Sequence, residues 1–181
     1  MADISGIALR LASTADCAAV AAVHARARSA YYRGRVPDQE LAEYAGTLPA
    51  RYQEVMARPG MTVRCAEQDA VVVGVTVAGA DREPGARQAG IARLYQIQVE
   101  PSCWRHGVGS RLMAACVRDW QAAGIGHARL DVWEHNARAQ AFYARHGWRP
   151  DGRTRSGPDN SRYLGLALRV PGPPARPRTA S

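Results

Sequence analysis

The stretch Val99-Glu-Pro-Ser-Cys-Trp-Arg-His-Gly-Val-Gly-Ser110 joins a predicted strand to a predicted helix, and it decides the fold. A proline ends the apolar run 92–99, and apolar residues with helical spacing follow over 108–120. Gly107 and Gly109 let the backbone turn tightly before that helix. The first N–H groups of a helix have no intrahelical acceptors, so this turn predicts a phosphate or pyrophosphate site, although a plain helix start would show the same glycines.

On both sides of this stretch, the periodicity predicts an α+β protein with a mixed sheet. Alternate valines over 71–77 are expected on one face of the sheet and Val72 on the other. The apolar parity breaks between Leu94 and Ile97, which is compatible with a β-bulge. The predicted strands are 7–11, 62–67, 70–78, 92–99, 128–133 and a final pair within 148–168; the predicted helices start near 18, run from 37 to 56 in two segments separated by Pro49, run from 108 to a stop at 124, and span 136–146.

Length and composition fit one soluble domain. The 181 residues are 46% hydrophobic and 22% charged, and no apolar run reaches the roughly 18 residues that a membrane helix needs. We expect a single domain over 1–170 and a disordered tail rich in proline and arginine over 171–181. The first seven residues lack a basic cluster before an apolar stretch, so we expect no secretory signal and a cytoplasmic protein.

The charge is carried by arginine alone and is unevenly placed. All 24 basic side chains are arginines, which excludes Schiff-base lysines and lysine phosphate loops. Residues 1–90 hold 10 arginines and 10 acids, whereas residues 91–181 hold 14 arginines and 6 acids, which accounts for the whole net charge of +8. The second half could meet an anion, or it could simply have a solvated basic surface.

The cysteines predict neither a disulfide framework nor a metal site. They are scattered and form no C-x-x-C pair. Cys103 and His106 form one C-x-x-H pair, but a zinc site needs a second such pair, so we predict no metal.

The region from Leu94 to Trp148 resembles the GNAT superfamily of acyl-CoA N-acyltransferases, and the order of elements extends the likeness over 7–168. Its pyrophosphate loop usually has Gln or Arg three residues before the first glycine, where this chain has Trp104. The matching residues are Gln98-Val-Glu-Pro101, Arg105 to Leu112, Leu130-Asp-Val132, Asn136, Ala139, Ala141-Phe-Tyr143 and His146-Gly-Trp148.

The resemblance implies a three-layer fold: a mixed, mostly antiparallel central sheet flanked by helices, with a splay between its fourth and fifth strands. It also implies acetyl-CoA as acyl donor, with Tyr143 giving a proton or hydrogen bond to the departing thiolate. Without the resemblance, Tyr143 could be a core aromatic and Asn136 a helix N-cap. The implied cofactor-binding residues are Ile97, Gln98, Val99, Arg105, His106, Gly107, Val108, Gly109, Ser110, Asn136 and Tyr143.

The acceptor site is less defined. Tyr31, Tyr32 and Tyr95 are candidate substrate-binding residues, and the paired tyrosines could receive a cationic amine or only pack a helix end. A general base is also not fixed; the candidates are Glu100, Tyr95, Glu67, Glu134 and His24.

We therefore predict an N-acetyltransferase acting on a primary amine of a small molecule or peptide, with a non-catalytic acyl-CoA sensor as the alternative. A nucleic-acid partner is not expected, because no RNA- or DNA-binding motif is present. No membrane partner is expected, and a homodimer stays an open option.

Overall fold

The computed structural model describes residues 6–83, 90–158 and 160–172. Most of the predicted tail, 173–181, lies outside the described residues. The elements follow the predicted order, with seven strands and four α-helices in this part of the chain. They are β1 (Ile7–Leu11), α1 (Cys17–Tyr32), α2 (Asp38–Met56), β2 (Met61–Gln68), β3 (Val71–Ala80), β4 (Ile91–Val99), α3 (Val108–Ala122), β5 (His127–Trp133), α4 (Ala137–Arg145), β6 (Arg149–Ser156) and β7 (Arg162–Arg169), with short 3₁₀ turns at Thr14–Asp16 and Pro101–Cys103.

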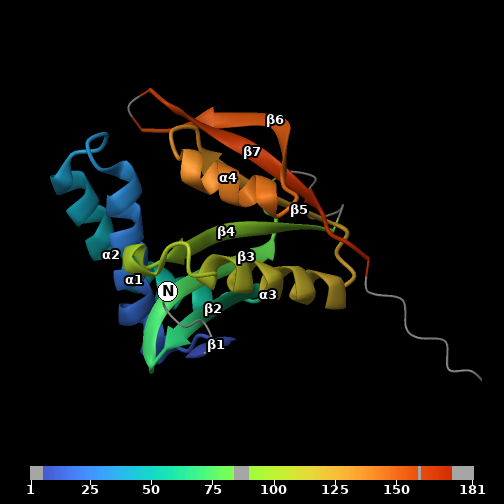
Figure 1. Cartoon of the computed structure of the whole chain (residues 1–181), viewed down its shortest axis with the longest axis horizontal. Helices are drawn as coiled ribbons and strands as arrows, with labels where there is room; N and C mark the ends of the chain where they lie inside the picture. Colours follow the sequence, from blue (N-terminus) through green and yellow to red (C-terminus); the bar gives the residue numbers. More distant parts are fainter. Residues whose placement is uncertain (1–5, 84–89, 159, 173–181) are drawn as a thin grey trace, which may run out of the picture.

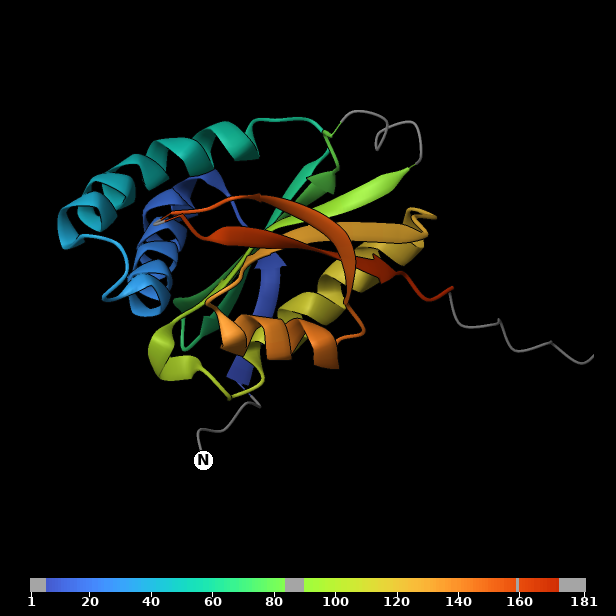
Figure 2. The same cartoon turned by 90° about the horizontal axis from the view of Figure 1, so that it is seen from above.

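The molecule has three layers. Figure 2 shows the sheet between the pair α1 and α2 and the pair α3 and α4. Buried residues of α1 and α2 pack with β2 and β3 on one face, and α3 packs with α4 and the strands β4, β5 and β7 on the other. The fold is therefore α+β with a central sheet flanked by helices, as predicted.

The sheet is mixed and splits in its middle. The strand order is β1-β2-β3-β4-β5-β7-β6, and only the β4–β5 pair is parallel. That pair joins Ile91–Arg93 to His127–Arg129 and then ends. The expected splay is thus confirmed, and in Figure 1 the end of β4 lies well away from β7.

Two bulges set which side chains face which layer. Tyr95 is the extra residue between the pairs Gln96–Val77 and Leu94–Ala78, so the predicted bulge in this strand is confirmed. A second bulge at Val73 was not predicted. It reverses the parity of β3, so that Val73 packs toward α3 while Val72 lies on the α1 side.

The separation of α2 into two segments at Pro49 is wrong. The helix runs unbroken from Asp38 to Met56 with Pro49 inside it. A proline removes the backbone donor to the carbonyl four residues earlier and disturbs the preceding turn. Buried side chains on both sides of the proline, Leu48 and Tyr52, hold the helix against the sheet.

We predict opposite stability changes for two glycine-to-alanine variants. A Cβ at Gly74 on β3 would lie 2.9 Å from Leu112 Cδ1 and 3.1 Å from Val108 Cγ1, so Gly74→Ala pushes α3 away from the sheet and should cost about 1–2 kcal/mol. Gly46 is inside α2 with open space around it, so Gly46→Ala should gain about 0.5–1 kcal/mol. Urea unfolding of both variants tests this, and a neutral Gly74→Ala would contradict the close helix–sheet contact.

Candidate active site

The opening between β4 and β5 begins where an ion pair replaces backbone pairing. Arg93, the last paired residue of β4, contacts the carboxylate of Asp131 on β5. Arg93 also pairs with Glu83 at 2.8 Å, and Arg153 of β6 reaches the same Glu83 at 3.0 Å. These contacts tie the two halves of the sheet together at the closed end of the opening.

Beyond Arg93, β4 presents an unpaired edge. The N–H of Glu100 donates to the Val73 carbonyl of β3 at 2.9 Å. Successive N–H groups in an antiparallel strand point to opposite sides, so those of Ile97 and Val99 point into the opening. They are placed to bind an extended ligand as an added strand would.

Trp104 makes two contacts that a Gln or Arg would not make in the same way. Its indole N–H donates to the Val99 carbonyl at 2.7 Å, which satisfies one acceptor on the open edge. The guanidinium of Arg138, in the first turn of α4, lies over its ring. Trp104 therefore holds the guanidinium of Arg138, which belongs to α4 on the other side of the opening, next to the loop.

Two residues with left-handed backbone shape the loop before α3. Arg105 has φ 67° and Gly107, the residue before the helix, has φ 76°. Gly109 is tightly packed, since a Cβ there would lie 3.3 Å from Phe142 of α4. The first turn of α3, whose N–H groups have no acceptors within the helix, therefore lies next to α4.

Arg105 and Arg138 have no acidic partner. No carboxylate pairs with either of them within the described ranges. Partial burial lowers the pKa of the Arg138 guanidinium, and the charge of Arg105 lowers it further. Two cations next to a helix N-terminus, whose dipole is also positive, form an environment that favours a polyanion.

The helix α4 carries the other predicted residues. Asn136 is its N-cap, and its Oδ1 accepts from the Ala139 N–H at 3.0 Å, so the capping role is confirmed. Tyr143 is only 8% exposed and packs with Trp148 and Phe142. Burial raises the pKa of the Tyr143 phenol, which therefore stays protonated. Nothing in the described part of the chain hydrogen-bonds its hydroxyl.

A polar contact joins α3 to α4. Ser110 Oγ lies 3.1 Å from His146 Nε2 at the end of α4. Burial lowers the pKa of His146, and Arg145 adds to the effect. Among the predicted cofactor residues, Val108 is buried under the loop, and Arg105, His106 and Ser110 lie nearer the surface.

The candidate acceptor residues do not share one surface. Tyr32 is 1% exposed and packs against Trp133, with its hydroxyl on that of Tyr163. Tyr31 is half-buried beside it, with ring centroids 4.6 Å apart. Tyr95 lies on the bulge of β4, where its hydroxyl donates to the Ala80 carbonyl at 2.8 Å. Of the three candidates, Tyr31 is the one whose pKa responds to Gln98, near the open end of β4.

The candidate general bases are engaged elsewhere. Glu100 accepts two hydrogen bonds from Arg26, at 3.0 and 2.8 Å, along a groove of about 360 Å³ between α1 and the end of β4. Glu67 pairs with Arg10, and Glu134 accepts from Arg162. His24 is buried, with Nδ1 3.1 Å from the Tyr52 hydroxyl.

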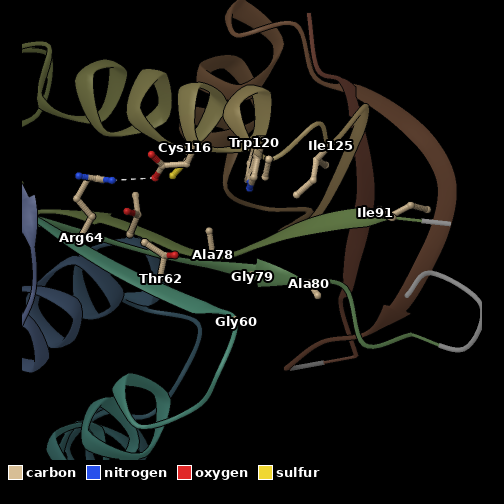
Figure 3. Close-up of a pocket in the computed structure, with 14 residues that line it drawn as sticks. Gly60, Thr62, Arg64, Ala78, Gly79, Ala80, Ile91, Cys116, Trp120 and Ile125 are labelled. Atoms are coloured by element: carbon tan, nitrogen blue, oxygen red, sulfur yellow. Dashed lines mark hydrogen bonds and ion pairs between the residues drawn. The ribbon is translucent and has the colours of Figure 1, made fainter. Parts of the chain in front are cut away.

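A hollow of about 310 Å³ that the sequence did not reveal lies at the other end of β4 (Figure 3). Its lining includes Cys116, Trp120 and the ion pair of Arg64 with Asp119, 2.8 Å apart. Ile91 also lines it, eight residues along β4 from Val99, which is about 26 Å at 3.3 Å per residue. The hollow is therefore separate from the glycine loop.

Comparison with known proteins identifies the family. The sequence profile of the acetyltransferase (GNAT) family matches residues 22–148. The chain belongs to the GNAT acetyltransferase family. The predicted resemblance is thereby confirmed, and the match covers the loop, the opening and the whole of α4.

Relatives extend the likeness to nearly the whole chain. A Mycobacterium tuberculosis protein described as a probable N-acetyltransferase is 29% identical over 157 residues, covering 83% of this chain and 84% of its own. The PaiA N-acetyltransferase of Thermoplasma acidophilum, solved with coenzyme A, has a TM-score of 0.72 at 15% identity and covers 90% of this chain and 98% of its own. The ribosomal-protein-S18-alanine N-acetyltransferase of Escherichia coli has a TM-score of 0.66 at 17% identity and covers 97% and 99%. The two solved structures share the fold.

The described residues also show whether this part of the chain holds disulfides, metal sites or membrane-spanning helices. All four cysteines are free. No group of three or more His, Cys, Asp or Glu in the described ranges is arranged to hold a metal ion. In the same part of the chain, no helix is long and apolar enough to cross a membrane.

We predict that His24 makes stability depend on pH between 6.5 and 4. Burial lowers the pKa of His24 to about 4, and the charges of Arg28 and Arg51 contribute. Below pH 6.5 the unfolded chain binds a proton that the folded chain does not. The free energy of unfolding therefore decreases by up to about 3 kcal/mol as the pH is lowered, and the loss is complete below pH 4. Urea unfolding at pH 7, 6 and 5 measures the slope, which His24→Gln should flatten; an unchanged slope would assign the effect to other groups.

Proposed function

We propose that the protein transfers the acetyl group of acetyl-CoA to the primary amine of a small molecule. The open edge of β4, which leads into the glycine loop before α3 and has Tyr143 of α4 in the adjoining core cluster, is the observation that carries this proposal. Family membership supports an acyltransferase, and the donor and the acceptor class are what the proposal adds.

The residues around the opening fit coenzyme A. Its pyrophosphate would meet the N–H groups of the first turn of α3 together with Arg105 and Arg138, two cations without a described counter-ion. Its extended arm would lie along the unpaired edge at Ile97 and Val99. When bound, acetyl-CoA supplies an electrophilic thioester carbonyl, whose C–S bond breaks as the C–N bond forms, with the amine proton ending on the sulfur.

The chain's own groups then have distinct roles. The N–H of Ile97 points into the opening, where it can donate to a carbonyl oxygen as negative charge grows on it. The Tyr143 phenol stays protonated and donates a hydrogen bond to a leaving sulfur. Because burial raises its pKa, full proton transfer from this phenol to a thiolate is uphill, so the hydrogen bond itself stabilises the leaving group.

The amine must lose its proton before attack, and the carboxylates near the opening are held by arginines. A positive environment lowers the pKa of a bound ammonium group. Arg51 supplies such a charge on the α1–α2 side, so the amine is expected to bind in its neutral form.

We predict that Gly107→Val abolishes coenzyme A binding through the loop and not through unfolding. A β-branched side chain at φ 76° strains the backbone by about 1–3 kcal/mol and obstructs the N-terminus of α3. Gly124→Val is the matched control, since Gly124 has φ 69° just past the other end of α3 and open space around it.

Both variants should lose similar stability, and only Gly107→Val should lose affinity in calorimetric titration with coenzyme A. Equal coenzyme A affinity in the two folded variants would refute the loop assignment. A wild-type protein that neither binds acetyl-CoA nor gains thermal stability from it would refute the proposed donor.

We predict that Tyr143→Phe slows acetyl transfer with little change in acetyl-CoA affinity. Only the hydroxyl that meets the leaving sulfur is lost, so the single-turnover rate should fall about 10²-fold. Rate and Kd are compared in both proteins. If Tyr143→Phe has the wild-type rate, Tyr143 is only a core aromatic. If the variant loses rate and acetyl-CoA affinity equally, Tyr143 is only a binding residue.

A further inference from the structure

Arg28 of α1 is held against two tyrosine rings from different helices. Its guanidinium carbon lies 4.4 Å from the ring centroid of Tyr32 and 4.0 Å from that of Tyr44 on α2. Stacking of this kind uses the faces of the planar group and fixes its orientation. Arg28 is half-buried, so the rings of Tyr32 and Tyr44 hold its charged group partly out of solvent.

The edge of the same guanidinium lacks an acidic partner. In the described ranges no carboxylate pairs with Arg28, and its buried Nε has no hydrogen-bond partner. Other half-buried arginines of this protein, such as Arg93 and Arg153, are paired with acids. A guanidinium fixed by its faces presents its edge donors in the geometry that a carboxylate accepts bidentately.

Arg28 lies one helical turn before Tyr31, the tyrosine of α1 that is near the end of β4. Tyr31 and Tyr32 follow it at i+3 and i+4, on the same side of α1. The electrostatics of the Tyr31 phenol place it near Gln98 of β4, near Arg28 itself and near Tyr143 of α4. An anion on Arg28 would therefore lie on the side of α1 that carries Tyr31, next to the end of β4.

The surroundings of Arg28 repel a second cation. Arg51 of α2 lies 5.0 Å from the Tyr44 ring centroid, on the same ring that Arg28 contacts. His24, one turn before Arg28, is buried and neutral at pH 7. The Tyr32 ring that could have received a cationic amine already carries Arg28. Polyamines and other acceptors with a second positive charge are thus disfavoured here.

We propose that Arg28 binds the carboxylate of the acceptor, which is a free α-amino acid or a close analogue. This inference rests on the proposed acetyltransferase function and names its substrate class. The carboxylate neutralises Arg28, and the amine of the same molecule reaches the open end of β4. A peptide N-terminus fits less well, because its carboxylate is further from the amine.

The test uses matched acceptors that differ only at the carboxylate. Free amino acids are compared with their amides and with the corresponding decarboxylated amines, together with dipeptides. Charge-assisted bidentate hydrogen bonds favour the acid form, so kcat/KM should be about 10- to 100-fold higher for the amino acid than for its amide. In parallel, calorimetry measures amino-acid binding to the coenzyme A-loaded protein, which does not depend on turnover.

Arg28→Gln should remove this preference by raising KM for amino acids about 10- to 100-fold, with coenzyme A affinity unchanged. Arg28→Lys keeps the charge without the bidentate fork and should restore part of the preference. Arg58→Gln is the control for net charge, because Arg58 pairs with Glu54 at the surface. Circular dichroism and thermal unfolding show whether each variant is folded.

The outcomes separate this inference from the proposed function. If amines are acetylated without a preference for the carboxylate, or if Arg28→Gln keeps the preference, the inference is overturned and the acetyltransferase stands. If no acceptor is acetylated but amino acids bind in an Arg28-dependent way, the catalytic function falls, and with it the acceptor role, while Arg28 is still shown to bind the carboxylate. Preference for dipeptides over amino acids also overturns the inference.

Discussion

The rest of the structure depends on where the parallel pairing of β4 and β5 stops. The two strands pair over three residues each and then part, which leaves the N–H groups of Ile97 and Val99 without a strand partner. An open strand edge inside a sheet is unfavourable unless something else binds it. The N-terminus of α3 lies on one side of this gap and Tyr143 of α4 on the other. The gap is therefore the place where an extended ligand with a phosphate group completes the sheet.

Two groups of arginines are important for the opening. One group is paired: Arg93, Arg153 and Arg155 converge on Asp131 and fasten the strands at the closed end of the gap. In the described residues, the other group has no acidic partner: Arg105 and Arg138 at the glycine loop and Arg28 on α1. Arg28 is half-buried, and a partly desolvated cation is costly without a counter-charge, while Arg105 and Arg138 flank the positive end of the α3 dipole. The unpaired group therefore indicates where anionic parts of ligands bind.

Local patterns allowed the order of elements to be predicted, and contacts between distant segments account for the errors. The glycine loop, the helix after it and the bulge near Tyr95 are visible as spacing along the chain. The continuity of α2 through Pro49 depends on packing against the sheet, and the bulge at Val73 depends on its pairing with β2. The site shows the same limit. Arg138 and Arg28 are ordinary surface-type arginines in the sequence, and only the folded chain places Trp104 under one and two tyrosines against the other.

At Trp104 the loop itself has no charged side chain, and a positive charge is supplied at this position by a residue of another helix. Where related loops carry Gln or Arg, this chain has an indole that donates to the Val99 carbonyl and offers its face to Arg138. The cation therefore comes from α4, on the opposite side of the gap. The two halves of the sheet are joined by Arg93 and Asp131 where the gap begins and by Trp104 and Arg138 where it opens. Because both contacts cross from the β4 side to the β5 side, they set the width of the gap from its two ends, and a ligand bound between them contacts both halves at once.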